Sequence, residues 1–147
     1  MAADSDGHLY QWGSSWSAPA HLPVQVSQGD LPFGAPIVQL SCGGNFAVAV
    51  TDTGDAYAWG SNNFGQLGDG TTTDRTAPVR VSQGERPAGV TFQKVYAGSL
   101  LPSGMTALGS DARVYSWGTT APVSSATART HSRRFRSLWH RGRFLRE

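Results

Sequence analysis

Two close pairs of carboxylates are the residues of this sequence whose types and spacing come nearest to catalytic chemistry. Asp52 and Asp55 form one pair, and Asp69 and Asp74 form the other. Paired carboxylates can carry out acid–base catalysis when a pocket shifts the pKa of one of them. Both pairs lie in glycine-rich segments, where aspartate more commonly accepts hydrogen bonds from turn amides. We therefore expect all four to have a structural role.

The other residues capable of chemistry are scattered along the chain. The four histidines, which lack the spacing of metal ligands, are His8, His21, His131 and His140. The single cysteine, Cys42, can form neither an internal disulfide nor a cysteine-based zinc site, and we expect it to pack as a small apolar residue at a strand end. The order of gaps between Gly65, Gly68 and Gly70 does not fit a dinucleotide-binding fingerprint. The sequence therefore predicts no enzyme, no metal site and no cofactor.

Composition and charge divide the chain into two parts. Eighteen glycines with only 15% charged residues are typical of short strands joined by many turns. Residues 1–128 hold five basic and nine acidic residues, a net charge of −4, whereas residues 129–147 hold seven arginines and one glutamate, a net charge of +6. No apolar stretch approaches the roughly 18 residues of a membrane-spanning helix. The charge pattern separates a mildly acidic folded region from a basic tail, and it leaves the cellular compartment open.

An internal repeat supplies the elements that position these residues. The pattern Tyr-x-Trp-Gly occurs three times, with its tryptophans at Trp12, Trp59 and Trp117. A second pair of matching segments, Pro23-Val-Gln-Val-Ser-Gln-Gly29 and Pro78-Val-Arg-Val-Ser-Gln-Gly84, lies between them. Such self-similarity at a period near 50 residues is typical of repeat architectures.

Each full repeat unit is expected to contain four short strands. For one unit we place them near residues 24–26, 37–41, 46–51 and 55–59, and for the next near 79–81, 92–96, 105–109 and 113–117. The Asp52-Thr-Gly54 link between two apolar strands indicates a hairpin. In the strand after it, Tyr57 and Trp59 alternate with Ala56 and Ala58, so that one face is aromatic and the other small. A sheet that is apolar on both faces must pack against something on each side, as propeller blades do.

The longest motif is specific enough to indicate a family. Residues 54–70, Gly-Asp-Ala-Tyr-Ala-Trp-Gly-Ser-Asn-Asn-Phe-Gly-Gln-Leu-Gly-Asp-Gly, resemble the signature of the regulator-of-chromosome-condensation repeat family. The repeat-signature positions are Gly54, Tyr57, Trp59, Gly60, Asn62, Gly65, Gln66, Leu67, Gly68 and Gly70, together with Tyr10, Trp12, Tyr115 and Trp117. The resemblance covers roughly residues 4–118 and implies an all-β fold of propeller blades, each of four antiparallel strands. Complete members form seven-bladed rings.

The sequence also departs from that family pattern. The first unit lacks the Gly-Gln-Leu-Gly segment, Phe46 stands where the family usually has histidine, and Ala112 stands where a hairpin glycine is expected. We divide residues 1–118 into a repeat remnant at 4–13 and repeat units at 14–60 and 61–118. About two blades and a remnant cannot close a seven-bladed ring, and unclosed ends leave exposed edges. We therefore expect a piece of a longer propeller protein. The alternative is a complete small protein that closes by self-association.

The basic tail has three interpretations. Residues 119–147 are expected to form a linker and an arginine-rich tail without fixed structure. Its arginines, with Phe135, Trp139 and Phe144, could instead bind nucleic acid through phosphate contacts and base stacking. Alternatively, Phe135, Leu138, Trp139 and Leu145 could share a helical face that lies on an anionic membrane. The abrupt change in composition favours the solvated tail.

Three functions follow from the resemblance, and fold alone does not decide among them. The first is a protein-binding or scaffold module. Its candidate surface is the long loop at residues 61–78, with Asn62, Asn63, Phe64, Asp69, Asp74 and Arg75, because loops on a rigid sheet scaffold commonly carry recognition. The second is nucleotide exchange on a small GTPase, as in the eukaryotic founder of the family. The third is a secreted inhibitor or binding propeller, as in bacterial members.

Overall fold

The protein, seen in a computed structural model, is built from β-strands. The structure describes residues 1–14, 19–98, 104–118 and 129–131. In chain order the strands are β1 (Ala2–Ala3), β2 (Leu9–Ser14), β3 (Pro19–Gln25), β4 (Ile37–Cys42), β5 (Phe46–Thr51), β6 (Ala56–Gly60), β7 (Arg75–Arg80), β8 (Phe92–Ala97), β9 (Gly104–Gly109), β10 (Val114–Gly118) and β11 (Arg129–His131). Within these described ranges, no helix is long and apolar enough to cross a membrane.

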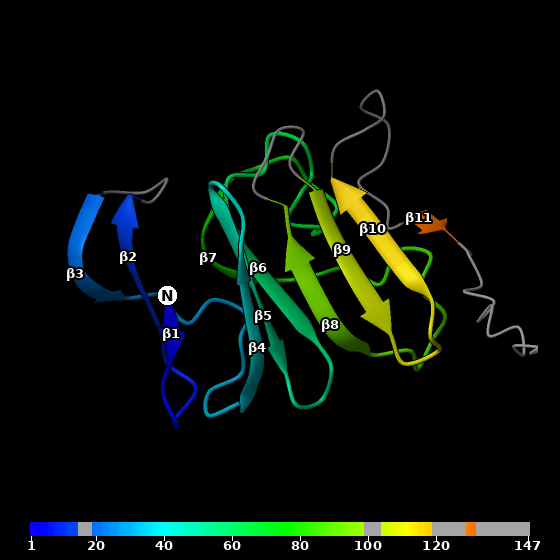
Figure 1. Cartoon of the computed structure of the whole chain (residues 1–147), viewed down its shortest axis with the longest axis horizontal. Coiled ribbons are helices and arrows are strands. Elements are labelled where there is room, and N and C mark those ends of the chain that lie inside the picture. The colour runs from blue at the N-terminus through cyan, green and yellow to red at the C-terminus, as the bar shows by residue number, and fades with distance from the viewer. Residues whose placement is uncertain (15–18, 99–103, 119–128, 132–147) are drawn as a thin grey trace, which may run out of the picture.

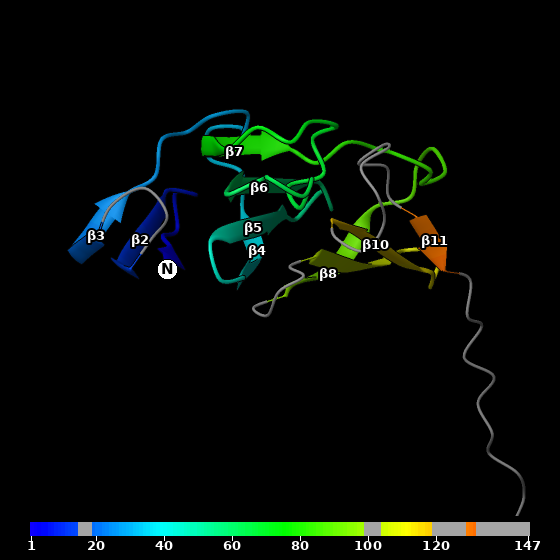
Figure 2. The ribbon, with the colours of Figure 1, turned by 90° about the horizontal axis from the view of Figure 1, so that it is seen from above.

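The strands form three antiparallel sheets that follow one another without closing (Figures 1 and 2). The first sheet has the order β1-β2-β3, the second β4-β5-β6-β7, and the third β8-β9-β10-β11. The two complete sheets match the expected propeller blade of four antiparallel strands, and the first is a three-stranded remnant. The all-β, incomplete propeller predicted from the sequence is therefore confirmed.

The predicted grouping of strands into sheets is wrong at two places. The strand near residues 24–26 was expected to share a sheet with residues 37–41, but β3 pairs with β2 in the first sheet. The strand near residues 79–81 was expected to share a sheet with residues 92–96, but β7 is the last strand of the second sheet. It pairs with β6, with Tyr57 opposite Arg80 and Ala58 opposite Val79. The amide of Val81 continues the pairing, with a hydrogen bond of 2.9 Å to the carbonyl of Ala56. The chain thus folds back onto the open edge of the strand just before it, as antiparallel neighbours joined by one loop commonly do.

The two faces of β6 bury against different neighbours, as the alternation predicted. Tyr57 and Trp59 lie in a cluster with Leu9 and Val26, around the first sheet. Ala56 and Ala58 lie in the other cluster, with Phe92, Val95 and residues of β10 in the third sheet. Every residue of β5 and β6 is buried. The second sheet is therefore the centre of the molecule, with a hydrophobic core on each side.

A positive backbone angle at Ala112 confirms that alanine has replaced a hairpin glycine. The φ angles of Gly7, Gly54 and Ala112, which occupy the same turn in the three sheets, are 81°, 79° and 60°. Ala112 is the non-glycine residue with positive φ among those that the structure describes. A left-handed conformation costs alanine about 1 kcal/mol relative to glycine.

Part of the segment expected to be a linker and tail is a strand. Arg129–His131 form β11, which pairs antiparallel with β10 and places Thr130 opposite Tyr115. This is the position that Arg80 holds opposite Tyr57 in the second sheet. The sequence offered no matching Pro-Val pattern to reveal it. Residues 119–128 and 132–147, with the aromatic residues of the tail, lie outside the described residues.

Candidate functional site

The candidate site is the signature loop, residues 61–74, which connects β6 to β7. Five of the six residues predicted from the sequence to form the partner-binding surface lie in this loop, and the sixth, Arg75, is the first residue of β7. The loop closes by three main-chain hydrogen bonds: Ser61 to Asn45, Gly65 to Asn62, and Gly68 to Gly65, at 2.8, 2.8 and 3.1 Å. It is therefore a folded unit and not a simple connection.

Asn62 lies at the centre of this loop with its side chain completely buried. Its amide oxygen accepts a hydrogen bond of 3.0 Å from the Leu67 main-chain nitrogen. Its amide nitrogen lies 3.1 Å from Oδ1 of Asp69 and 3.0 Å from the carbonyl oxygen of Thr73. A buried amide whose donors and acceptor are all used holds the loop in one conformation. Asn62 therefore shapes the loop from inside and offers a partner no surface.

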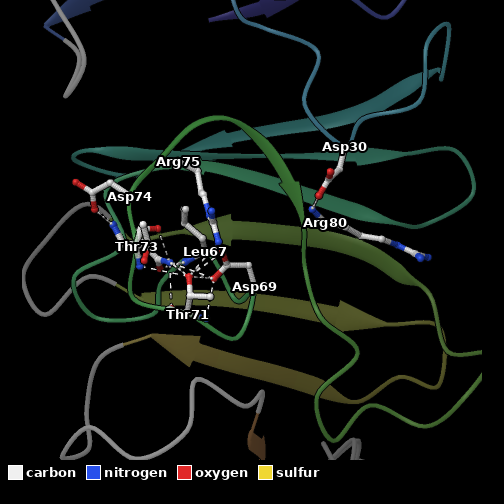
Figure 3. Close-up of polar contacts among 9 residues, drawn as sticks. Asp30, Leu67, Asp69, Thr71, Thr73, Asp74, Arg75 and Arg80 are labelled. Atoms are coloured by element: carbon white, nitrogen blue, oxygen red, sulfur yellow. Dashed lines mark hydrogen bonds and ion pairs between the residues drawn. The ribbon is translucent and has the colours of Figure 1, made fainter.

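Asp69 forms the second internal contact, with Arg75 (Figure 3). The carboxylate accepts a hydrogen bond of 2.9 Å from Nε of Arg75 and one of 2.9 Å from the Thr71 main-chain nitrogen, and Nη2 of Arg75 lies 2.8 Å from it as an ion pair. Burial alone would raise the pKa of Asp69, but hydrogen bonds from Thr71, Arg75 and Asn62 outweigh it and hold that pKa below its ordinary value. The Asp69 side chain is buried and charged, and it fixes the start of β7 relative to the loop.

The outer surface of the loop carries the remaining candidates. Asn63, Phe64 and Asp74 are exposed, and Phe64 is 54% accessible although it is large and apolar. The Phe64 main-chain nitrogen donates a hydrogen bond of 2.9 Å to the Gln66 side chain. Oδ1 of Asp74 accepts a hydrogen bond of 2.7 Å from the Asn62 main-chain nitrogen. The backbone at Phe64 is thus held while its ring is exposed, and the exposed Asp74 carboxylate is held at one oxygen by the loop.

The middle of the loop reaches across to the third sheet. Leu67 is completely buried in the core between the second and third sheets. Trp117 of β10 donates a hydrogen bond of 3.1 Å from Nε1 to the carbonyl oxygen of Gln66. Gly68, with φ of 68°, packs so closely that a Cβ there would lie 2.5 Å from the same indole nitrogen. The Gly-Gln-Leu-Gly segment therefore joins two sheets, and its residue types follow from that contact.

Comparison with known families agrees with this geometry. The family model described as Regulator of chromosome condensation (RCC1) repeat matches residues 37–66, and a second model of the same description matches residues 53–100. This chain belongs to the RCC1 repeat family. The matches cover the second sheet, the signature loop and β8, where the repeat pattern of the sequence is strongest.

Several known proteins are similar to this chain over part of their own length. The ultraviolet-B receptor UVR8 of Arabidopsis thaliana is 34% identical over an alignment of 113 residues, and the match covers 70% of this chain and 24% of UVR8. The human E3 ubiquitin-protein ligase HERC2 is 30% identical over an alignment of 101 residues, and the match covers 56% of this chain and 2% of HERC2. The crystal structure of Prp20p from Saccharomyces cerevisiae, with a TM-score of 0.67 at 17% identity, covers 87% of this chain and 35% of Prp20p.

These relatives support a coarse functional conclusion. The chain spans about a quarter or less of the two curated relatives and about a third of Prp20p. The RCC1 repeats of this chain, together with its likeness to solved propeller structures, support a repeat module that binds protein. The likeness to Prp20p shows the fold alone.

Two contacts between RCC1 sheets were not foreseen from the sequence. The Gln39 side chain donates to the Val95 carbonyl at 2.6 Å and accepts from the Val95 amide at 3.0 Å, and Ser41 Oγ accepts from the Ala97 amide at 3.0 Å. Both side chains lie on β4 and bind the backbone of β8 in the next sheet. Their signal in the sequence is a polar residue at alternate positions of an otherwise apolar strand.

Arg86 was also missed, and alignment of the two RCC1 units could have found it. In the segments Ser27-Gln-Gly-Asp-Leu31 and Ser82-Gln-Gly-Glu-Arg86, arginine replaces a leucine that is buried in the first core. The guanidinium lies 4.1 Å from the centroid of the Phe92 ring. Its Nε and Nη1 are buried and have no hydrogen-bond partner within the described part of the chain. Burial lowers the pKa of Arg86.

The residues first considered for chemistry have ordinary contacts. Asp55 pairs with Arg80 at 2.6 Å, and His8 Nδ1 lies 3.1 Å from Asp4, while His21 is exposed. Cys42 corrects one expectation: it ends β4 but is exposed, with Sγ 3.7 Å from the Met1 sulfur. In the part of the chain that the structure describes, no three histidine, cysteine or acidic side chains gather as metal ligands would.

Proposed function

We propose that the signature loop is the protein-binding surface of this RCC1 module, with Phe64 as its anchor. The observation that carries the proposal is the exposure of a phenylalanine on a loop whose backbone is fixed from inside. Aromatic side chains that become buried in an interface commonly contribute much of its binding energy. The exposed polar side chains of Asn63 and Asp74 would form the rim around it.

The internal contacts of the loop support this assignment. Binding costs less free energy when the binding residues are already ordered. Asn62 and the Asp69–Arg75 pair order the loop, and Leu67 attaches it to the core between the second and third sheets. The six residues named from the sequence thus divide into two groups. Asn62, Asp69 and Arg75 shape the loop, and Asn63, Phe64 and Asp74 are proposed to contact the partner.

The experiment compares partners captured by the wild-type chain and by matched variants. Phe64→Ser removes the proposed anchor, and Phe33→Ser removes another exposed phenylalanine far from the signature loop. With quantitative mass spectrometry of proteins captured from an extract of the source cells, we expect at least one protein to be lost with Phe64→Ser and retained with Phe33→Ser. If both variants retain every protein that the wild type captures, the loop is not the binding surface.

Nucleotide exchange on a small GTPase is the second candidate, and it has a separate test. Prp20p, whose structure is described with its binding to Gsp1p and histones, supplies the analogy at the level of the fold. The proposal assigns no catalysis to this chain. Adding it to Gsp1p loaded with a fluorescent guanine nucleotide should leave the release rate unchanged. A clear acceleration would replace the binding role with exchange.

A further inference from the structure

The two internal interfaces of this molecule have the same construction. Between the second and third sheets, Tyr115 and Trp117 of β10 pack on a face that includes Ala58 and Val48. Between the first and second sheets, Tyr57 and Trp59 of β6 pack with Leu9 and other residues of the first sheet. In each case the Tyr-x-Trp face of one sheet covers the opposite, smaller face of the sheet before it.

The first sheet displays the same aromatic face, and among the described residues no further sheet packs on it. Tyr10 and Trp12 lie on β2 at the positions that Tyr57 and Trp59 hold on β6. Trp12 is 45% exposed, whereas Trp59 is 1% and Trp117 is 5% exposed. An indole that is 45% exposed forgoes part of the free energy that its two equivalents gain by burial. We call this surface, defined by Tyr10 and Trp12, the head face.

The third sheet displays the complementary face at the opposite end of the molecule (Figure 1). Thr106 pairs with Ser116 in the register in which Val48 pairs with Ala58. Val48 and Ala58 are completely buried, but Thr106 is exposed. Val114, at the position of buried Ala56, is 37% exposed. We call this surface, defined by Thr106, Val114 and Ser116, the tail face.

We propose that the head face of one molecule binds the tail face of a second copy, continuing the succession of sheets from molecule to molecule. The binding partner that we infer is a second copy of the chain. The chain forms this contact twice between its own sheets, and its first and third sheets each display one of the two surfaces that form it. Two different surfaces are used, so the association is head-to-tail and open to further addition.

The hydrogen bonds between β4 and β8 indicate how the proposed contact between molecules differs from the contacts between sheets within one molecule. Gln39 on β4 both donates to and accepts from the Val95 backbone. The corresponding residue on β8 is Lys94, which pairs with Leu108 as Gln39 pairs with Val50. Lysine can donate but not accept. The first sheet has three strands and no counterpart of β4 or β8. The proposed contact therefore rests on the packing of Tyr10 and Trp12.

The test measures solution mass by light scattering after size exclusion, over a hundredfold range of concentration. The wild type should change from the 15.6 kDa monomer toward multiples of that mass. Trp12→Ser removes the head face, and Thr106→Arg places a charge in the centre of the tail face; each variant should remain monomeric at every concentration. Phe64→Ser, an exposed aromatic on neither face, should associate like the wild type. Far-UV circular dichroism checks that each variant keeps its strands.

Mixing the two disrupted variants separates head-to-tail association from any symmetric contact. The Trp12→Ser molecule keeps its tail face and the Thr106→Arg molecule keeps its head face, so an equal mixture should form a dimer and stop there. A wild type that remains monomeric throughout overturns the proposal, and so does a mixture that fails to associate. The outcome does not depend on the proposed function, because that role is tested by Phe64→Ser alone.

Discussion

The indole nitrogen of Trp117 donates a hydrogen bond of 3.1 Å to the carbonyl oxygen of Gln66, which precedes it by 51 residues and belongs to the loop of another sheet. The equivalent nitrogen of Trp59 is buried and has no hydrogen-bond partner among the residues that the structure describes. The first unit lacks the Gly-Gln-Leu-Gly segment that supplies the carbonyl to Trp117. Leaving a buried donor unpaired costs about 1–3 kcal/mol, so the signature loop contributes directly to the contact between sheets.

Replacing Gly68 with alanine should weaken that contact. Gly68 has φ of 68°, and a Cβ there would lie 2.5 Å from Trp117 Nε1, so backbone strain and overpacking act together. We expect Gly68→Ala to lower the free energy of unfolding by about 2–4 kcal/mol in urea titrations. Gly70→Ala is the matched control, because φ there is 84° and the nearest atom is 3.8 Å away. It should cost about 1 kcal/mol, and equal losses in the two variants would contradict the close packing.

Replacing Ala112 with glycine should stabilise the protein. The φ of 60° at Ala112 is strained for alanine and free of strain for glycine. We expect a gain of about 1 kcal/mol, seen as a higher melting temperature by circular dichroism. The reverse change at the same turn of the second sheet, Gly54→Ala, should be strongly destabilising, because its Cβ would collide with the Thr91 side chain. An unchanged or lower melting temperature for Ala112→Gly would show that the turn has been placed in the wrong register.

Replacing Arg86 with leucine should also stabilise the protein. Leucine fills the corresponding core position at Leu31, whereas two guanidinium nitrogens of Arg86 are buried without a hydrogen-bond partner among the described residues. The substitution removes a cation–π contact with Phe92 that contributes about 0.5–2 kcal/mol. It also removes the larger free-energy cost of burying guanidinium nitrogens without hydrogen bonds. We expect a net gain of about 1 kcal/mol in urea unfolding. A less stable variant would mean that the cation–π contact outweighs the desolvation cost.

The stability contributed by Asp69 should depend on pH in one direction. Its pKa is lower in the folded chain than the ordinary value of about 3.9, so the unfolded chain binds a proton more readily. The stabilisation is complete above the unfolded pKa and is lost as pH falls through the folded pKa. Asp69→Asn should therefore cost about 2 kcal/mol near pH 7 and progressively less as the pH falls below about 4. Measuring both proteins by urea unfolding between pH 7 and pH 2 gives the difference. A difference that stays constant over that range would mean that Asp69 is not ionised in the fold.

The sequence predicted the strands and their faces well because the repeat presents the same local pattern three times. Tyr57 and Trp59 alternate with Ala56 and Ala58, and such alternation assigns a residue to a face whatever surrounds the sheet. The positive φ at Ala112 was predictable for the same reason, since glycine holds the equivalent turn positions. The predicted loop at residues 61–78 ends earlier than expected, because residues 75–78 belong to β7. Asn62 and Asp69 look like surface residues of a polar loop, but their side chains are buried inside it.

The all-β class, the repeat, the family and the aromatic and small faces of each sheet could be predicted from the sequence, because they follow from local spacing and residue type. Tertiary packing was needed to establish that β7 closes the second sheet and that β11 completes the third, since a short strand can pair with either neighbouring edge. It also decided that Gln66 accepts from Trp117 and that Gln39 binds Val95. These contacts join residues more than 50 positions apart, and their partners are chosen by how sheets stack in space, which local pattern does not encode.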